Sequence, residues 1–281
     1  MSAVLEEVAA QRDSARPQCA NGRWRRAIGM ALLVLLLAVA AVGPWVSGFD
    51  AISQDLDQVR QAPSAMHWLG TDHLGRDQLA RLSAALRVSL GGALLAVAAA
   101  MVLGCSLGVL AAWRGGWAER LSVVLADAAM ALPGLLLVLL LAALAPGAYA
   151  LVYLGLAVAM WVEYFRVVRA MSRSVLAGSP VEAARLLGFG PLYIVRRHLL
   201  PELLPVVGTL ACFGVSAAVL AMAALGFVGV GLQPPDAELG VMLIELMPYY
   251  QEAPWLIGAP VACLLILLSA LVLLAGDKDP R

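Results

Sequence analysis

The sequence predicts an all-α, polytopic membrane protein with six transmembrane helices. Hydrophobic residues make up 62% of the 281 residues and charged residues only 14%, which is far from the composition of an ordinary soluble domain. Several uninterrupted apolar stretches reach the roughly 20 residues that a helix needs to cross a bilayer. A backbone in hydrocarbon must satisfy its own hydrogen bonds, and the alternation typical of a β-barrel is absent from the sequence, so we expect helices.

The six predicted spans follow one another along the chain. They cover residues 27–46, 88–113, 121–144, 149–168, 206–230 and 256–274. Pro133 and Gly134 fall in the middle of the third span, where proline should kink the helix. Gly226, Gly229 and Gly231 end the fifth span and allow close helix approach or irregular backbone. Pro133, Gly226 and Gly229 are therefore candidates for a pathway or gate, with simple packing as the alternative.

The distribution of basic residues predicts that both termini are cytoplasmic. With the N-terminus inside, 15 Lys and Arg residues lie on the cytoplasmic side and 4 on the outer side, which together are the 19 in the chain. Cytoplasmic segments of membrane proteins carry such an excess. Residues 1–26 are then a cytoplasmic tail, residues 47–87 an extracytoplasmic segment, and residues 88–281 the core transmembrane domain. The polar start of the tail does not fit a cleaved signal peptide.

The segment 179–201 is unusually polar for its place between two apolar spans. Ser179 can cap a helix, Pro180 suits its first position, and Glu182 would complete a capping box. Gly188 should end this helix, because glycine adopts a left-handed conformation without strain. A second short helix is expected from Gly190-Pro191 through residue 198, before Pro201 begins the fifth span.

Two functions fit this segment on spacing alone. It could be a connector whose oily side lies among lipid headgroups. It could instead be a rigid knob that docks into another protein. The knob would have a small-residue face, formed by Ala183, Ala184 and Gly188, and an apolar tip formed by Leu186, Leu187 and Phe189.

Histidine and cysteine give no metal site. His67 and His73 lie near Asp72 and Asp77, but the spacing fits no common metal pattern, and local ion pairs and helix caps explain these residues better. The four cysteines form no CxxC pair, and three lie inside apolar runs, so they are expected to pack as small apolar side chains.

Two acidic residues lie within or near the spans. Asp127 can pair with Arg120 or Arg166, and Glu163 has Arg166 three residues later on its own helix. Such charges can also contact a solute, but we favour structural pairing. The sequence has no Walker A or HExxH pattern, so no catalytic residue is assigned and an enzyme is not expected.

Three motifs carry a resemblance to a known family. Glu182-Ala183-Ala184, followed by Gly188 and the distant Leu200-Pro201, resembles the EAA loop of ABC-importer permeases. The stretch HWLGTDHLGRDQLARLSAALRVSL, residues 67–90, is similar to a signature of peptide and nickel importers. LGFVGVGLQPPDAELGVML and the closing DPR also match this group. The resemblance covers about residues 25–281 and points to the C-type permease of dipeptide, oligopeptide and nickel systems.

The resemblance implies a type I ABC-importer permease fold in the cell inner membrane, surrounded by lipid. It implies a homologous second permease, two cytoplasmic ATP-binding subunits and an extracytoplasmic solute-binding protein as partners, with no cofactor and no nucleic acid. The residues that it assigns to ATPase coupling are Glu182, Ala183, Ala184, Leu187, Gly188 and Phe189. The solute would be a peptide, nickel or a metal chelate.

Two alternatives are an ion-coupled secondary transporter and an intramembrane enzyme. A secondary transporter should show broken helices in paired, repeated halves, and an enzyme should show convergent acids, bases or ligands. Neither explains the glycine-terminated segment 179–201. Glu163 stands where the resembled family seldom carries a charge.

Overall fold

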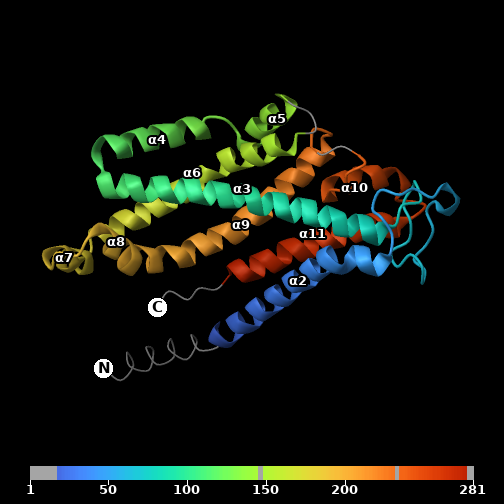
Figure 1. Cartoon of the computed structure of the whole chain (residues 1–281), viewed down its shortest axis with the longest axis horizontal. Helices are drawn as coiled ribbons and strands as arrows, with labels where there is room; N and C mark the ends of the chain where they lie inside the picture. The colour runs from blue at the N-terminus through green and yellow to red at the C-terminus, as the bar shows by residue number, and fades with distance from the viewer. Residues whose placement is uncertain (1–17, 145–147, 232–233, 277–281) are drawn as a thin grey trace, which may run out of the picture.

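The computed structural model describes residues 18–144, 148–231 and 234–276. The longer helices are α2 (Gln18–Ser47), α3 (Gln78–Arg114), α4 (Gly116–Met130), α5 (Gly134–Leu144), α6 (Tyr149–Leu176), α9 (Leu200–Phe227) and α11 (Pro254–Ala275). Shorter ones are α7 (Ser179–Leu186), α8 (Pro191–Ile194) and α10 (Leu239–Leu246). Within these described ranges no strand forms, which confirms the predicted all-α class (Figure 1).

Five described helices are long and apolar enough to cross a membrane, or up to six if the bent pair α4–α5 counts as one span. The predicted tail, residues 1–26, is described only from residue 18, where α2 begins. Residues 1–17 and the closing residues 277–281 lie outside the described residues.

The third predicted span is two helices and not one kinked helix. α4 and α5 meet at an angle of 78° across the break between Met130 and Gly134. Pro133 lies in this break, where its ring and its missing N–H prevent a continuous helical ladder. Its carbonyl accepts a hydrogen bond from the Leu137 N–H at 3.1 Å, which begins α5. Proline therefore breaks this span more completely than a kink would.

Two other helix boundaries differ from the prediction. α3 begins at Gln78, well before residue 88, because the Asp77 carboxylate accepts a hydrogen bond from the Ala80 N–H at 2.7 Å and caps the helix. The expected second short helix is not separate from the fifth span. α8, a π-helical turn (Val195–Leu199) and α9 form one helix of 37 residues, in which the Leu200 N–H bonds to the Val195 carbonyl.

The π-helical turn has a local cause. Pro201 has no N–H to donate, and its ring would crowd the carbonyl four residues earlier in a regular α-helix. A wider turn just before it re-pairs the neighbouring backbone groups. The polar segment thus leads directly into α9 without a joint.

α3 and α6 form the central helix pair. α3 places a small residue at every fourth position, namely Gly92, Ala96, Ala100, Gly104 and Gly108. A Cβ at Gly104 would lie 2.4 Å from the Trp161 carbonyl oxygen, and one at Gly108 would lie 3.0 Å from the Phe165 carbonyl oxygen. Membrane helices gain little from the hydrophobic effect on association, so such close backbone packing is what holds them together.

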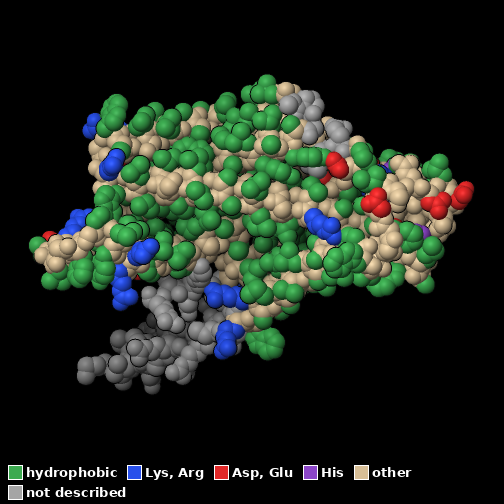
Figure 2. Space-filling view, viewed as in Figure 1, with side chains coloured by type: hydrophobic (Ala, Val, Ile, Leu, Met, Phe, Trp, Pro, Cys, Tyr) green, Lys and Arg blue, Asp and Glu red, His purple; other side chains and the backbone are tan. Residues whose placement is uncertain are grey.

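The remaining helices surround this pair. α2 packs on α3 and α11, and α9 packs on α3, α6 and α11. α7 and α8 project at one end of the bundle, called here the α7 end, and residues 48–77 with α10 form the opposite end, called the loop end (Figure 1). Figure 2 shows hydrophobic side chains along the flank, with basic side chains gathered towards the α7 end and acidic ones at the loop end.

The α3–α6 contact yields a stability prediction. Gly104→Ala should destabilise the purified protein by about 1–3 kcal/mol, because the new methyl group would overlap the Trp161 backbone. Gly91→Ala is the matched control, since a Cβ there would meet no described atom within 4 Å. Thermal unfolding in detergent measures both variants. Equal unfolding midpoints for the two would contradict the assigned role of the close contact.

Candidate functional site

The first turn of α7 is built differently from the predicted capping box. Gly178 occupies the N-cap position, and its carbonyl accepts hydrogen bonds from the N–H groups of Val181 at 3.1 Å and Glu182 at 3.2 Å. Ser179 is therefore the first helical residue, and Pro180 is the second. The capping box was wrong, because this shift of one residue moves Glu182 beyond the position from which its side chain could reach back to the cap.

The end of α7 is a Schellman turn at Gly188. Gly188 has a φ of 81°, and its N–H donates to the Arg185 carbonyl at 3.0 Å. The Phe189 N–H donates to the Ala184 carbonyl at 3.0 Å, which completes the paired pattern of this turn. The predicted glycine stop is thus present in the structure, with Gly188 in the conformation that only glycine adopts easily.

The turn leaves an apolar tip exposed. Leu186 is 84% exposed and Leu187 75% exposed, and Phe189 is exposed beside them. Glu182, Ala183 and Gly188 are also exposed. Ala184 is different, because it is buried with Val181 on the inner side of α7. Five of the six residues that the resemblance assigned to coupling are therefore exposed, and Ala184 is buried.

Contacts within the chain hold the tip in place. The Phe189 and Tyr193 rings stack with centroids 4.2 Å apart, which ties the turn to α8. The Arg185 guanidinium lies 5.8 Å from the Trp113 ring centroid, which ties α7 to the end of α3. Ile194 and Leu199 are fully buried beneath. The segment that contains α7 and α8 is thus an anchored projection with an apolar end. We call residues 179–199 the knob.

The three candidate gate residues lie in two different places. Gly229 ends α9 in a second Schellman turn, with a φ of 76° and its N–H donating to the Gly226 carbonyl at 2.9 Å. Gly226 also permits α10 to cross α9, since a Cβ there would lie 3.1 Å from the Val241 nitrogen. Pro133 belongs to a different element, the α4–α5 break. The irregular backbone predicted at the end of the fifth span is present, whereas the kink predicted at Pro133 is a break between two helices.

A buried charge cluster lies at the loop end. The Asp72 carboxylate is fully buried and accepts hydrogen bonds from Arg76 Nε at 2.6 Å and Arg81 Nη1 at 2.6 Å. Both arginines are also buried, and both reach Glu245 on α10. Buried charges are tolerated when they are paired and hydrogen-bonded in this way. The cluster joins the loop, the start of α3 and α10 into one unit.

The charge on Asp72 is maintained by its surroundings. Burial alone would raise its pKa, but the Arg81 and Arg76 charges and the backbone N–H groups of Arg76 and Leu74 outweigh burial, so the pKa lies below the ordinary value of 3.8. The resulting stabilisation is present above that value and is lost as the pH falls through the lowered pKa.

The other residues of the LGTDHLGRD motif shape the same loop. Gly70 and Gly75 have φ values of 77° and 74°, and a Cβ at Gly75 would overlap the Asp55 carbonyl. Asp77 caps α3 and also bonds to His67 Nδ1 at 2.9 Å. The predicted local pairs and caps are therefore present. No group of three or more His, Cys, Asp or Glu side chains that could hold a metal ion occurs among the described residues.

The two acidic residues near the α4–α6 contact differ in whether they form an ion pair. Asp127 bonds to Arg166 at 2.7 Å, one of the two pairings predicted for it. The expected pairing of Glu163 with Arg166 is not formed, because Arg166 turns to α4 instead. Glu163 is exposed on α6, and within the described residues it has no ion pair.

Glu238 is a buried helix cap that sequence reasoning missed. Its carboxylate is almost fully buried and accepts hydrogen bonds from the Gly240 and Val241 N–H groups at 2.8 and 3.0 Å and from the Ser89 hydroxyl at 3.0 Å. It therefore caps α10 and ties it to α3. Burial raises the pKa of Glu238, which these three donors oppose. An acidic residue just before an apolar run was the available signal.

The stretch GCSLG in α3 matches the G-x-S-x-G spacing of hydrolase nucleophile elbows, but it lacks their context. Ser106 lies within the long helix and donates to the Leu103 carbonyl at 3.0 Å, whereas an elbow places serine on a sharp strand-to-helix turn. Its glycines, Gly104 and Gly108, serve the packing against α6. The pattern therefore indicates no catalytic serine.

The chain is thus a bundle of helices that are long and apolar enough to cross a membrane, with an anchored projection at one end and an ion-paired loop unit at the other. Among solved structures, the chain is similar to one from "Inward facing conformations of the MetNI methionine ABC transporter", with a TM-score of 0.50, 21% identity, and coverage of 66% of this chain and 88% of that one. This likeness shows the type I ABC-importer permease fold.

Residues 102–277 match the family described as "Binding-protein-dependent transport system inner membrane component". The chain is 32% identical to the glutathione transport system permease protein GsiD of Pectobacterium atrosepticum, over 90% of this chain and 87% of the relative. It is 32% identical to the nickel transport system permease protein NikC of Escherichia coli K12, over 83% and 84%. It is 37% identical to the di/tripeptide transport system permease protein DppC of Pseudomonas aeruginosa, over 89% and 84%.

The chain therefore belongs to the family of binding-protein-dependent transport system inner membrane components, and it is a permease of the ABC-importer type. The relatives named above are permease proteins of transport systems. They give no support to a secondary transporter or an intramembrane enzyme.

The loop-end cluster yields a second prediction. Arg81→Ala should destabilise the protein by about 3–5 kcal/mol, because it leaves the buried Asp72 carboxylate and the partly buried Glu245 carboxylate with one cation fewer. Glu252→Gln, which removes an exposed ion pair with Arg60, should cost less than about 1 kcal/mol. Thermal unfolding near neutral pH measures both. A small loss for Arg81→Ala would show that the cluster does not hold the loop end.

Proposed function

We propose that this chain is one membrane half of an importer whose energy comes from ATP hydrolysed by partner subunits. A homologous second permease would complete the path across the membrane. Two ATP-binding subunits would bind at the α7 end, and an extracytoplasmic solute-binding protein would dock at the loop end. The chain itself supplies the helices, the knob and the loop-end unit.

The observation that carries this proposal is the exposed tip of the knob. Leu186, Leu187 and Phe189 stand in the open on a turn whose backbone is fixed by Gly188 and whose base is anchored to α3 and α8. An apolar projection held this firmly suits docking into a groove. Its conformation is already fixed before binding, so docking loses less conformational entropy. Burying Leu186 and Phe189 would contribute on the order of 2 kcal/mol each.

The proposed binding of ATP-binding subunits at the α7 end also sets the orientation of the chain in the membrane. The α7 end would face the cytoplasm, with residues 1–26 as a cytoplasmic tail and both termini inside. The loop end, including most of residues 47–87, would then be extracytoplasmic. The 15-to-4 distribution of basic residues supports this orientation.

The solute class is inferred from the named relatives. They are permease proteins for glutathione, nickel and di- or tripeptides, so we propose a peptide, nickel or metal-chelate type solute for this chain. Pro133, Gly226 and Gly229 remain our candidates for the pathway or gate, because each lies where a regular helix stops or is crossed closely.

Gly188→Val should uncouple ATP hydrolysis from transport. A β-branched residue would strain the left-handed turn by about 1–2 kcal/mol and shift the apolar tip. The variant should still insert and assemble, but the solute-binding protein should no longer stimulate its ATPase activity. Stimulated ATP hydrolysis in reconstituted complexes is the measurement.

Gly190→Val is the matched control for this variant. Gly190 lies in the same turn, has a φ of −73°, and a Cβ there would meet no described atom within 4 Å. It should keep most of the stimulation. Full stimulation of the Gly188→Val complex would argue for a passive connector on the membrane surface and against docking.

Topology can be tested independently of coupling. A reporter fused after Arg281 should read as cytoplasmic, and one inserted near Gln61 should read as external, because basic residues are retained inside. Paired fluorescent-protein and alkaline-phosphatase fusions distinguish the two sides. A cytoplasmic signal from the insertion at Gln61 would overturn the six-span orientation.

A further inference from the structure

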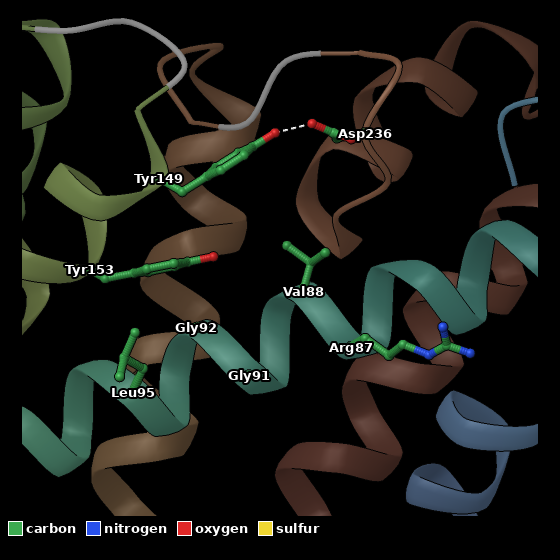
Figure 3. Close-up of a pocket in the computed structure, with 8 residues that line it drawn as sticks. All are labelled: Arg87, Val88, Gly91, Gly92, Leu95, Tyr149, Tyr153 and Asp236. Atoms are coloured by element: carbon green, nitrogen blue, oxygen red, sulfur yellow. Dashed lines mark hydrogen bonds between the residues drawn. The ribbon is translucent and has the colours of Figure 1, made fainter.

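A pocket of about 340 Å³ lies near the loop end, between α3, the start of α6 and the segment that leads into α10 (Figure 3). α6 contributes Tyr149 and Tyr153, and the segment before α10 contributes Asp236. α3 contributes the remaining lining residues, which are Arg87, Val88, Gly91, Gly92 and Leu95. No role assigned above uses this pocket.

The two tyrosines are fixed against the other walls. The Tyr149 hydroxyl donates a hydrogen bond to the Asp236 carboxylate, so α6 and the segment before α10 meet above the pocket (Figure 3). The Tyr153 ring lies across Gly92, where a Cβ would be 2.3 Å from the ring. Glycine is therefore required at position 92 for the ring to lie there. The tyrosines line the pocket with their rings and hydroxyl groups.

Asp236 is the charged side chain that lies beside the two tyrosines. Arg87 is the one cationic lining residue of the pocket, but its guanidinium donates to the backbone carbonyls of Ala40 and Ala41 on α2. Figure 3 shows that this side chain runs away from the two tyrosines. Asp236 is exposed, and its oxygens can accept more than the single bond from Tyr149. The carboxylate is thus left to face any bound group.

These features select a particular ligand chemistry. A carboxylate accepts strong, charge-assisted hydrogen bonds from an ammonium group, and aromatic faces attract cations. Val88 and Leu95 supply apolar contact for carbon atoms next to the charge. An anion would meet the Asp236 charge without a directed cation. The pocket therefore suits a small cationic group joined to a short aliphatic part.

We propose that this pocket binds a protonated primary amine. The amine could come from the solute, as the ammonium end of a peptide, or from the headgroup of phosphatidylethanolamine in the surrounding bilayer. Both sources present the same ammonium group on a short carbon chain. The solute source rests on the proposed import function, whereas the lipid source requires only that the chain lies in a membrane.

Binding to the purified, assembled transporter in detergent tests the proposal. Glycylglycine and N-acetylglycylglycine form one pair of probes, and short-chain phosphatidylethanolamine and phosphatidylglycerol form the other. In each pair the second probe lacks the ammonium group, because acetylation converts it to an amide and phosphatidylglycerol carries glycerol in place of ethanolamine. Isothermal titration gives Kd for each probe, and at least one amine probe should bind more tightly than its amine-free counterpart.

Asp236→Asn should raise the Kd of the bound amine about tenfold or more, because a hydrogen bond between two charged groups is replaced by a weaker one. Asp57→Asn is the control, since it removes an exposed carboxylate at the same end of the molecule and should leave Kd unchanged. Tyr149→Phe should keep binding, since it only releases Asp236 from its hydroxyl partner.

The two pairs of probes distinguish an amine from the solute from an amine of the lipid headgroup. Tighter binding of glycylglycine than of its acetylated form assigns the pocket to the solute, and preference for phosphatidylethanolamine alone assigns it to lipid. The proposal is overturned if neither amine binds, if the amine-free probes bind equally well, or if Asp236→Asn binds like the unmodified protein. Stimulation of ATPase activity by the solute-binding protein is measured separately, so failure of import and failure of amine binding are distinguished.

Discussion

The α3 and α6 backbones approach each other so closely at Gly104 that a single methyl group would collide with the Trp161 carbonyl oxygen. This contact determines where most other elements can lie. α9 and the α4–α5 pair pack on α6, and α2 packs on α3, so each takes its position from the central pair. In a membrane, where lipid competes with protein for apolar contact, shape fit of this kind replaces the hydrophobic effect as the source of specificity.

The two ends of the bundle are stabilised by different interactions. At the loop end, buried ion pairs from Asp72 to Arg76 and Arg81, continued to Glu245, join segments that are far apart in sequence. At the α7 end, stacking and packing hold the knob, and its apolar tip stays exposed. The two ends of the bundle therefore differ in both the kind of contact that holds them and the surface that they expose.

The same glycine turn appears in both places with different consequences. Gly188 and Gly229 each end a helix in a Schellman turn with a positive φ. The turn at Gly188 leaves the side chains beside it exposed. The turn at Gly229 lets the chain fold back so that α10 can cross α9 near Gly226. Local backbone chemistry is shared, and the surroundings decide what the turn is used for.

The sequence by itself determined the helical class, the approximate spans, the glycine end of α7 and the position of the irregularity at Pro133, but not its extent, because each depends on hydrophobic length or on the backbone limits of glycine and proline. It did not determine the cap of α7, since Gly178 and Ser179 are both able to begin a helix and only the path of the chain selects between them.

The tertiary structure decided between the alternative charge pairs that the sequence allowed. Arg166 has acidic candidates on its own helix and on α4, and the packing of α4 against α6 gives it Asp127 and leaves Glu163 exposed. The pocket near the loop end likewise joins Tyr149 and Tyr153 on α6 to Asp236, which follows α9 in the chain. Such contacts depend on how whole helices are placed, which no local pattern encodes.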